Sequence, residues 1–129
     1  MIRLKRVYEP VRSTDGTRFL VERLWPRGIK KASLRLDGWL KELGPSHELR
    51  RWFSHDPRKW DGFRRRYLSE LRQNATAWTP ILKAAINGRV TLLFSSHDTE
   101  HNNAVALREF LSARMISKRV PQAHIHRTA

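Results

Sequence analysis

The 129-residue sequence contains no cysteine. Disulfide scaffolds, thiolate zinc sites and cysteine nucleophiles are therefore excluded, and nothing signals an oxidising compartment. The sequence also lacks any apolar run near the roughly 20 residues that a membrane-spanning helix needs, and its basic start is not followed by the hydrophobic region of a signal peptide. We therefore expect a soluble cytoplasmic protein that does not associate with membranes.

Acidic residues are scarce, with 12 Asp and Glu against 26 Lys and Arg, which gives a net charge of +14 with neutral histidines. The excess of positive charge predicts an anionic partner, but it identifies neither the partner nor a reaction. Residues 1–41 carry 11 basic and 4 acidic side chains, and residues 50–72 carry 8 and 3. Because the charge is spread through the chain, it favours a charged surface over a detachable nucleic-acid-binding arm.

Strand signals lie at both ends of the chain. Residues 2–8 alternate apolar and basic side chains, whereas the runs at 18–25 and 90–96 are apolar on both faces, as is typical of central strands. Because helical patterns follow these strands, we predict one α/β domain over residues 1–116, with a small, mostly parallel sheet and helices packed on it. Residues 117–129 are predicted to form a basic, loosely ordered tail.

Helix-start signals are strong in the middle of the chain. Asp37 can cap a short helix that the Gly-Pro pair at 44–45 ends, and Ser46 can cap a second one. Asp56 as N-cap, with Pro57 at the first helical position, predicts a third helix. Its apolar side chains follow a helical period and are predicted to lie in the core: Trp60, Phe63, Tyr67 and Leu71.

Two further helices complete the prediction. Thr79 and Pro80 are interpreted as the start of a fourth helix, which ends at the Asn-Gly pair at 87–88. The last helix follows the strand at 90–96, with Asp98 or Thr99 as its N-cap.

Polar side chains follow two of the predicted strands, in residues 22–28 and 95–102. Ligands of open α/β sheets bind beyond the carboxyl ends of the strands, so these two clusters form one pocket if the strands are neighbours. The candidate ligand-binding residues are Arg23, Trp25, Arg27 and Asn102, and the candidate catalytic residues are Asp98 and His101. The guanidinium groups would hold a phosphate- or nucleotide-like anion, the indole would wall the site, and the Asp–His pair would move protons or orient the ligand.

A purely structural interpretation of the same clusters is that Arg23 pairs with Asp98 or Glu22 while the other polar residues cap helices and turns. The sequence leaves catalysis and binding both open within the pocket hypothesis.

The histidines add weaker signals. His97 and His101 have the spacing of a helical metal-binding pair, but the predicted helix start lies between them, so their register is wrong and we expect no metal and no cofactor. His55 precedes the predicted N-cap of the third helix. It is either a general base or, as its position favours, a turn histidine packed beside Trp52.

A second functional hypothesis is non-enzymatic binding of nucleic acid by the basic surface, with arginines such as those at 64–66 tracking phosphates and aromatic side chains stacking on bases. The helical period places Trp60, Phe63 and Tyr67 in the core instead, which argues against stacking by those residues. A partner-binding accessory domain is a third alternative, which would need a large exposed apolar patch.

Several motifs in one order resemble the YeaO-like bacterial proteins, a family of unknown function (domain of unknown function 488). They are Val21-Glu22-Arg23-Leu24-Trp25-Pro26-Arg27-Gly28, Asp37-x-Trp39-Leu40-Lys41, Pro45-Ser46-x-x-Leu49-Arg50-x-Trp52-Phe53-x-His55-Asp56-Pro57-x-x-Trp60, Phe63-x-x-Arg66-Tyr67-x-x-Glu70-Leu71, and Val90-Thr91-Leu92-Leu93 with Glu100-His101-Asn102. The resemblance covers about residues 2–115. It implies a small cytoplasmic bacterial α/β protein and brings no assigned reaction.

The chain departs from the pattern of that family at three positions. Glu22 stands where the family usually has Asp, and His97 is peculiar to this chain. Asn103 replaces a second histidine of the family pattern. If that histidine transfers protons in relatives, this chain has lost or altered the activity.

Overall fold

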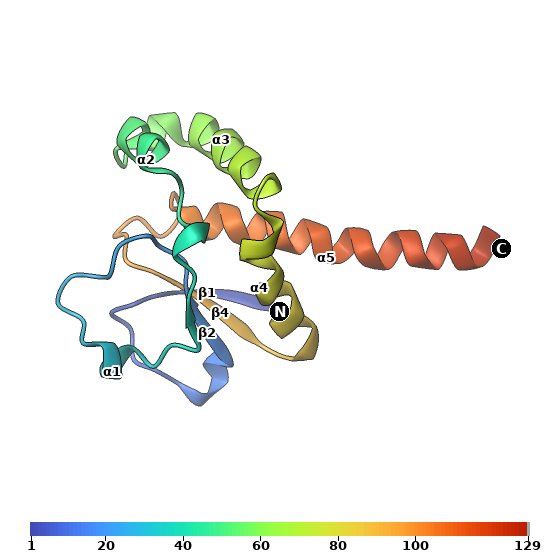
Figure 1. Cartoon of the computed structure of the whole chain (residues 1–129), viewed down its shortest axis with the longest axis horizontal. Helices are drawn as coiled ribbons and strands as arrows, with labels where there is room; N and C mark the ends of the chain where they lie inside the picture. Colours follow the sequence, from blue (N-terminus) through green and yellow to red (C-terminus); the bar gives the residue numbers. More distant parts are fainter. Residues whose placement is uncertain (129) are drawn as a thin grey trace.

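The computed structural model describes the backbone of residues 1–128 and the side chains of residues 1–116. Its sheet has the order β1-β4-β2-β3, and every neighbouring pair is parallel. The strands are β1 (Ile2–Arg6), β2 (Thr17–Leu20), β3 (Gly38–Trp39) and β4 (Val90–Phe94). The helices are α1 (Lys31–Leu34), α2 (His47–Phe53), α3 (Trp60–Arg72), α4 (Ala75–Asn87) and α5 (Asn103–Thr128), and 3-10 turns span Ser13–Asp15, Lys41–Leu43 and Pro57–Lys59. The predicted α/β fold with a small parallel sheet is confirmed (Figure 1).

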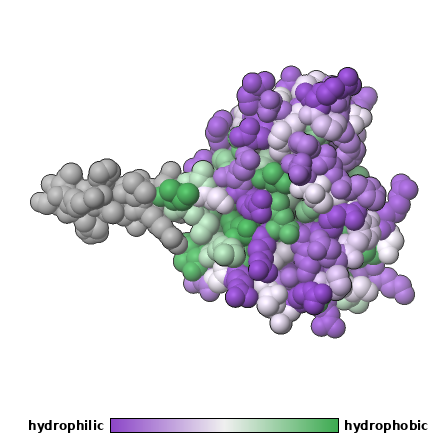
Figure 2. Space-filling view, turned by 180° about the vertical axis from the view of Figure 1, so that it is seen from behind, coloured by the Kyte–Doolittle hydropathy of each residue, from purple (hydrophilic) through white to green (hydrophobic). Residues whose placement is uncertain are grey.

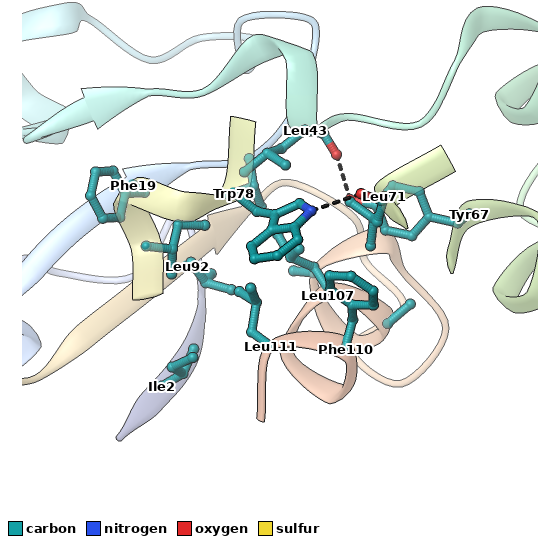
Figure 3. Packing of buried hydrophobic residues seen from close by; sticks show 14 of the residues in the cluster. Ile2, Phe19, Leu43, Tyr67, Leu71, Trp78, Leu92, Leu107, Phe110 and Leu111 are labelled. Atoms are coloured by element: carbon teal, nitrogen blue, oxygen red, sulfur yellow. Dashed lines mark hydrogen bonds between the residues drawn. The ribbon is translucent and has the colours of Figure 1, made fainter. Parts of the chain in front are cut away.

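The sheet is covered on both faces. The central strand β4, which lies between β1 and β2, is therefore buried along its whole length. Side chains alternate between the faces of a strand. Leu92 therefore joins a large core with α3, α4 and α5, whose members pack around Trp78, Leu107 and Leu111 (Figure 3). Leu93 points to the other face and joins a smaller cluster with Leu20, Leu34 and Val7.

The predicted core stripe of α3 is confirmed at Phe63, Tyr67 and Leu71, whereas Trp60 is half-buried and packs against the edge of the core. Phe63 and Tyr67 are buried, and their rings stack with centroids 5.7 Å apart. The Tyr67 hydroxyl donates a hydrogen bond to the carbonyl of Leu43 (Figure 3). Burial is the main cause that raises the pKa of Tyr67, so this hydroxyl stays a donor, and it joins α3 to the chain just before α2.

The predicted caps in the middle of the chain are also confirmed. Asp56 accepts a hydrogen bond from the backbone N–H of Arg58 at 3.0 Å, and Pro57 starts the 3-10 turn that leads into α3. The Ser46 Oγ accepts from the N–H of Leu49 at 3.2 Å and donates to the Glu70 carboxylate of α3 at 2.6 Å. One serine thus caps α2 and ties it to α3.

Replacing Ser46 by alanine should lower the free energy of unfolding by about 1 kcal/mol, the usual cost of a lost N-cap. Chemical denaturation of the variant measures this change. Ser69→Ala, at an exposed position on α3, is the matched control and should leave the midpoint unchanged. Equal effects of the two substitutions would contradict the capping role.

The helix predicted after Asp37 is wrong. The chain there pairs with β2 as the edge strand β3 and then forms only a 3-10 turn. The N–H of Asp37 donates to the carbonyl of Arg18 at 2.8 Å, and the N–H of Leu40 donates to that of Leu20 at 2.8 Å. The open edge of β2 therefore supplies hydrogen bonds that outweigh the local helical signal. The strand predicted at 18–25 is too long, because β2 ends at Leu20.

The start predicted for the fourth helix is also wrong, because α4 begins at Ala75 and contains Pro80. Trp78 lies in the first turns of α4, is 8% exposed, and donates a hydrogen bond from Nε1 to the carbonyl of Leu71 at 2.7 Å. Its ring also meets that of Phe110 edge-on. Burying this indole keeps residues 75–79 helical, which outweighs the single backbone hydrogen bond that the proline removes.

The backbone of α5 continues to Thr128, whereas the side chains from residue 117 onward lie outside the described part, so the loosely ordered tail at 117–129 stays a prediction. Among the described residues, no helix combines the length and the apolar character that a membrane crossing requires. Seen from behind, the surface is mostly hydrophilic, and a smaller hydrophobic area lies toward the C-terminal helix (Figure 2).

Candidate functional site

The two polar clusters of the sequence meet in space. Because β2 pairs with β4, with Leu20 opposite Leu93, the segments that follow these strands leave the sheet at the same edge. Between them opens a cleft of about 830 Å³. All six candidate residues line it: Arg23, Trp25, Arg27, Asp98, His101 and Asn102.

Side chains from other elements hold the segment that follows β2. The Nδ2 of Asn103 donates to the carbonyl of Val21 at 2.7 Å, and the Nε1 of Trp39 donates to the carbonyl of Glu22 at 2.7 Å. These two bonds satisfy carbonyls that the sheet no longer pairs, so the chain leaves the strand in a defined direction. Asn103, where the family pattern has a histidine, is 9% exposed and serves this backbone contact.

Arg23 and Arg27 both line the cleft. The Nε of Arg23 donates to the carbonyl of Pro45 at 2.9 Å, and among the described residues its terminal nitrogens have no hydrogen-bond partner. The Arg27 side chain is exposed and likewise has no partner among these residues. Neither arginine forms an ion pair with Asp98 or Glu22 in the described part of the chain, so the purely structural interpretation of Arg23 does not hold.

Trp25 forms a fixed wall of the cleft. Its Nε1 donates to the carbonyl of Ile29 at 2.7 Å, and its ring meets that of Trp39 edge-on with centroids 5.2 Å apart. An indole held by a hydrogen bond and by a second ring loses little further rotamer freedom when a ligand packs against it.

Asp98 and His101 form a pair at the other side of the cleft. The Oδ2 of Asp98 lies 3.0 Å from Nδ1 of His101, and its Oδ1 accepts from the N–H groups of Glu100 and His101 at 2.9 Å each. Burial opposes the charge of this carboxylate, but the backbone and histidine hydrogen bonds prevail and lower the pKa of Asp98. The His101 ring also meets the Trp60 ring edge-on at 5.3 Å, which fixes its orientation.

The expected helix start at Asp98 or Thr99 is wrong. Asn102 caps α5, because its Oδ1 accepts from the N–H of Val105 at 3.1 Å, and its Nδ2 donates to the carbonyl of Asp98 at 2.9 Å. Asp98 instead closes a turn before the helix. His97 lies near the Nη2 of Arg6, and among the described side chains no group of three His, Cys, Asp or Glu residues could hold a metal ion.

Other residues that sequence reasoning did not choose for the site also line the cleft, among them Glu22, Arg50 and His55. Ser54 and His55 have positive φ angles of 47° and 56°, and the ring of His55 neighbours that of Phe53 at 6.4 Å. The sequence signal for Arg50 was its spacing from Phe53. Residues three apart lie on the same side of a helix, so this spacing places Arg50 on the side of α2 that carries Phe53.

Glu22 is the carboxylate that follows directly on the apolar run of β2. Its Oε2 accepts from the N–H and the Oγ of Ser95 at 3.2 and 3.1 Å. Burial raises the pKa of Glu22, although these hydrogen bonds and the charges of His55 and Arg50 oppose the rise. The sequence signal for this residue was a carboxylate placed directly after the apolar run at 19–21.

Comparison with known proteins identifies the family of this chain. A family described as "Inactive DUF488-N3 subclade" matches residues 1–126. The uncharacterized protein YeaO of Escherichia coli (strain K12) is 44% identical over 110 residues, which are 85% of this chain and 96% of the relative. An uncharacterized protein of Mycobacterium tuberculosis is 37% identical over 113 residues, 88% of this chain and 95% of the relative. No solved structure matches the chain. The chain therefore belongs to the YeaO-like proteins, in the inactive DUF488-N3 subclade.

Proposed function

We propose that the strand-end cleft binds a small anionic ligand of the phosphate or nucleotide type. The observation that carries this proposal is the convergence of Arg23 and Arg27, with free terminal nitrogens among the described residues, on one cleft. Guanidinium groups bind phosphate oxygens through paired, charge-assisted hydrogen bonds, which are about twice as strong as neutral ones. Of the carboxylates there, Asp98 is already engaged by His101 and by the backbone.

The size of the cleft supports a ligand larger than phosphate. Its volume of about 830 Å³ lies in the range of sites that enclose whole small molecules. Its wall includes Trp25 and Tyr8 beside the arginines, so a ligand with a flat apolar part and a charged end would use both kinds of side chain.

The family description favours binding over catalysis. The subclade is described as inactive, and Asn103 uses its amide to hold the carbonyl of Val21. In this proposal the Asp98–His101 pair orients the ligand. The Nδ1–H of His101 faces the Asp98 carboxylate, which leaves Nε2 of the neutral imidazole to accept a hydrogen bond from a hydroxyl or amino group of the ligand.

Titration calorimetry with ribose 5-phosphate and with inorganic phosphate tests the proposal. The double variant Arg23→Gln, Arg27→Gln should bind ribose 5-phosphate at least about tenfold more weakly, since hydrogen bonds to charged groups contribute about 1.5–3 kcal/mol. Arg65→Gln and Arg72→Gln, on the exposed side of α3, form the matched control and should bind as the unaltered chain does. The proposal fails if the unaltered chain binds neither compound.

The alternative function is binding of nucleic acid by the basic surface, and the net charge of +14 is the observation that favours it. Part of that charge has other contacts, because Lys59 and Arg66 lie over the ring of Trp52 at 5.2 and 4.0 Å. Filter binding at low salt decides between the two. Under this alternative the α3 arginine variants would weaken binding and affinity would fall steeply with salt, whereas no retention of nucleic acid would eliminate it.

A further inference from the structure

We propose that Glu22 determines which anion the cleft accepts, by taking a hydrogen bond from an exocyclic amino group, so that the ligand is a nucleoside phosphate with an amino-bearing base. This inference rests on the proposed function and deepens it.

The two oxygens of the Glu22 carboxylate have different surroundings. Oε2 accepts two hydrogen bonds from Ser95, one from its backbone N–H and one from its hydroxyl. Oε1 accepts none from any described residue, and it is not sealed from solvent. Because Glu22 lines the cleft, Oε1 is the atom that a ligand can reach.

An ionised carboxylate only accepts hydrogen bonds, and a desolvated one is costly without partners. A ligand that covers Glu22 must therefore present a donor to Oε1. Arg50 and His55 lie near Glu22, but among the described residues neither donates a hydrogen bond to its carboxylate, so Oε1 stays open to a donor on the ligand. The negative charge of Glu22 favours placing the anionic end of the ligand nearer Arg23 and Arg27. The ligand therefore has an anionic end and a donor-bearing end.

A planar base is the donor-bearing group that fits the remaining walls. Trp25 lines the cleft and is held by Trp39 and by its hydrogen bond to Ile29, so it offers a rigid aromatic wall. Stacking of a base on an aromatic side chain contributes about 1–3 kcal/mol. A phosphorylated alkylamine has the same two ends but no flat part, and it would leave much of the cleft of about 830 Å³ empty.

Glu22→Gln gives a sharp test, because Ser95 dictates how the new amide must lie. The backbone N–H of Ser95 can only donate, and its hydroxyl donates to the same oxygen, so the amide oxygen of the glutamine must turn toward them. Its NH₂ group then occupies the place of Oε1. The substitution changes the group offered to the ligand from an acceptor into a donor at nearly constant shape.

Cytidine and uridine monophosphates are suitable probes, because one base carries an amino donor where the other carries a carbonyl acceptor. In mildly alkaline buffer, calorimetry of the unaltered chain should show CMP binding at least about fivefold tighter than UMP, the lower end of the discrimination expected for such a contact. Glu22→Gln should reverse the order. Glu22→Asp, which keeps the acceptor, should retain the preference for CMP. Ribose 5-phosphate and phosphoethanolamine should bind detectably and more weakly than CMP.

Equal affinity for CMP and UMP in the unaltered chain would overturn the inference and leave the anion-binding proposal standing. Phosphoethanolamine binding as tightly as CMP would overturn the nucleobase assignment. If none of the four compounds binds, both proposals fail. Circular dichroism checks that the variants are folded, and if Glu22→Gln does not fold, the CMP-to-UMP ratios of the unaltered chain and of Glu22→Asp decide the question.

Discussion

Replacing Asp15 by asparagine should lower the free energy of unfolding by about 3–5 kcal/mol, the cost of removing one partner from a buried ion cluster. Asp15 and Arg18 are 3% and 4% exposed, and Asp15 contacts the Nη1 of Arg18 at 2.5 Å and the Nζ of Lys5 at 2.9 Å. These groups lie on the sheet face opposite the large core. Asparagine keeps an acceptor for the N–H of Arg12 but leaves two cations without a counter-charge.

The same cluster makes stability depend on acid. Burial works against the Asp15 charge, yet the hydrogen bonds from the Arg12 backbone, Lys5 and Arg18 lower its pKa below the usual value of about 3.9. A group with a depressed folded pKa stabilises fully above its unfolded pKa and loses that contribution as the pH falls through the folded one. The difference in unfolding free energy between the unaltered chain and Asp15→Asn should therefore shrink as the pH falls below about 3.9.

Urea denaturation at a series of pH values measures both effects. Asp56→Asn is the matched control, because Asp56 pairs with an Arg58 side chain that is 90% exposed, and asparagine can still cap the 3-10 turn. Exposed pairs contribute little, so this variant should change the midpoint only slightly. A similar loss in both variants would show that the Asp15 cluster is not stabilising as a buried unit.

Gly44→Ala should destabilise the fold by about 1–3 kcal/mol and weaken ribose 5-phosphate binding, because overpacking moves the backbone. A Cβ at Gly44 would lie 2.7 Å from the Cγ of Arg23 and 2.8 Å from its backbone nitrogen. The conformation of Gly44, with φ of −65°, suits alanine, so the expected effect comes from the contact alone. Arg23 and Glu22, which both line the cleft, would have to shift.

Thermal unfolding and calorimetry of the same preparation separate the two effects. Gly88→Ala is the control, since its backbone is extended and no described atom lies within 4 Å of the position that a Cβ would take there. That variant should keep both stability and affinity. If Gly44→Ala binds ribose 5-phosphate as the unaltered chain does, the packing of Arg23 on Gly44 does not position the cleft.

The sequence predicted the parts of the fold in which one local signal had no competitor. Ser46 and Asp56 cap where expected because each side chain bonds backbone groups within its own turn. Phe63 and Tyr67 lie in the core because the helical period places the apolar side chains of α3 on one side of the helix. The six candidate residues share one cleft because parallel strands that are neighbours must end at the same edge.

The predictions failed where contacts with a distant segment stabilise a conformation that differs from the local preference of the sequence. The residues after Asp37 form an edge strand because β2 has an unpaired edge within reach. Residues 75–79 are helical because Trp78 can bury its indole against Phe110. Asn102, and not Asp98, caps α5 because Asp98 is engaged by its own turn and by His101.

By itself, the sequence determined that the protein has no cysteine chemistry, has a net positive charge, is an α/β protein, and carries arginines at the exit of a buried strand. Only the tertiary structure decided which of the 26 basic side chains face a cleft and which lie over aromatic rings or pair with a buried aspartate. It also decided that Glu22 and His55, far apart along the chain, line the same cleft. The reason is physical: composition and periodicity report the local environment of a residue, whereas a binding site depends on contacts between segments that only the packed sheet brings together.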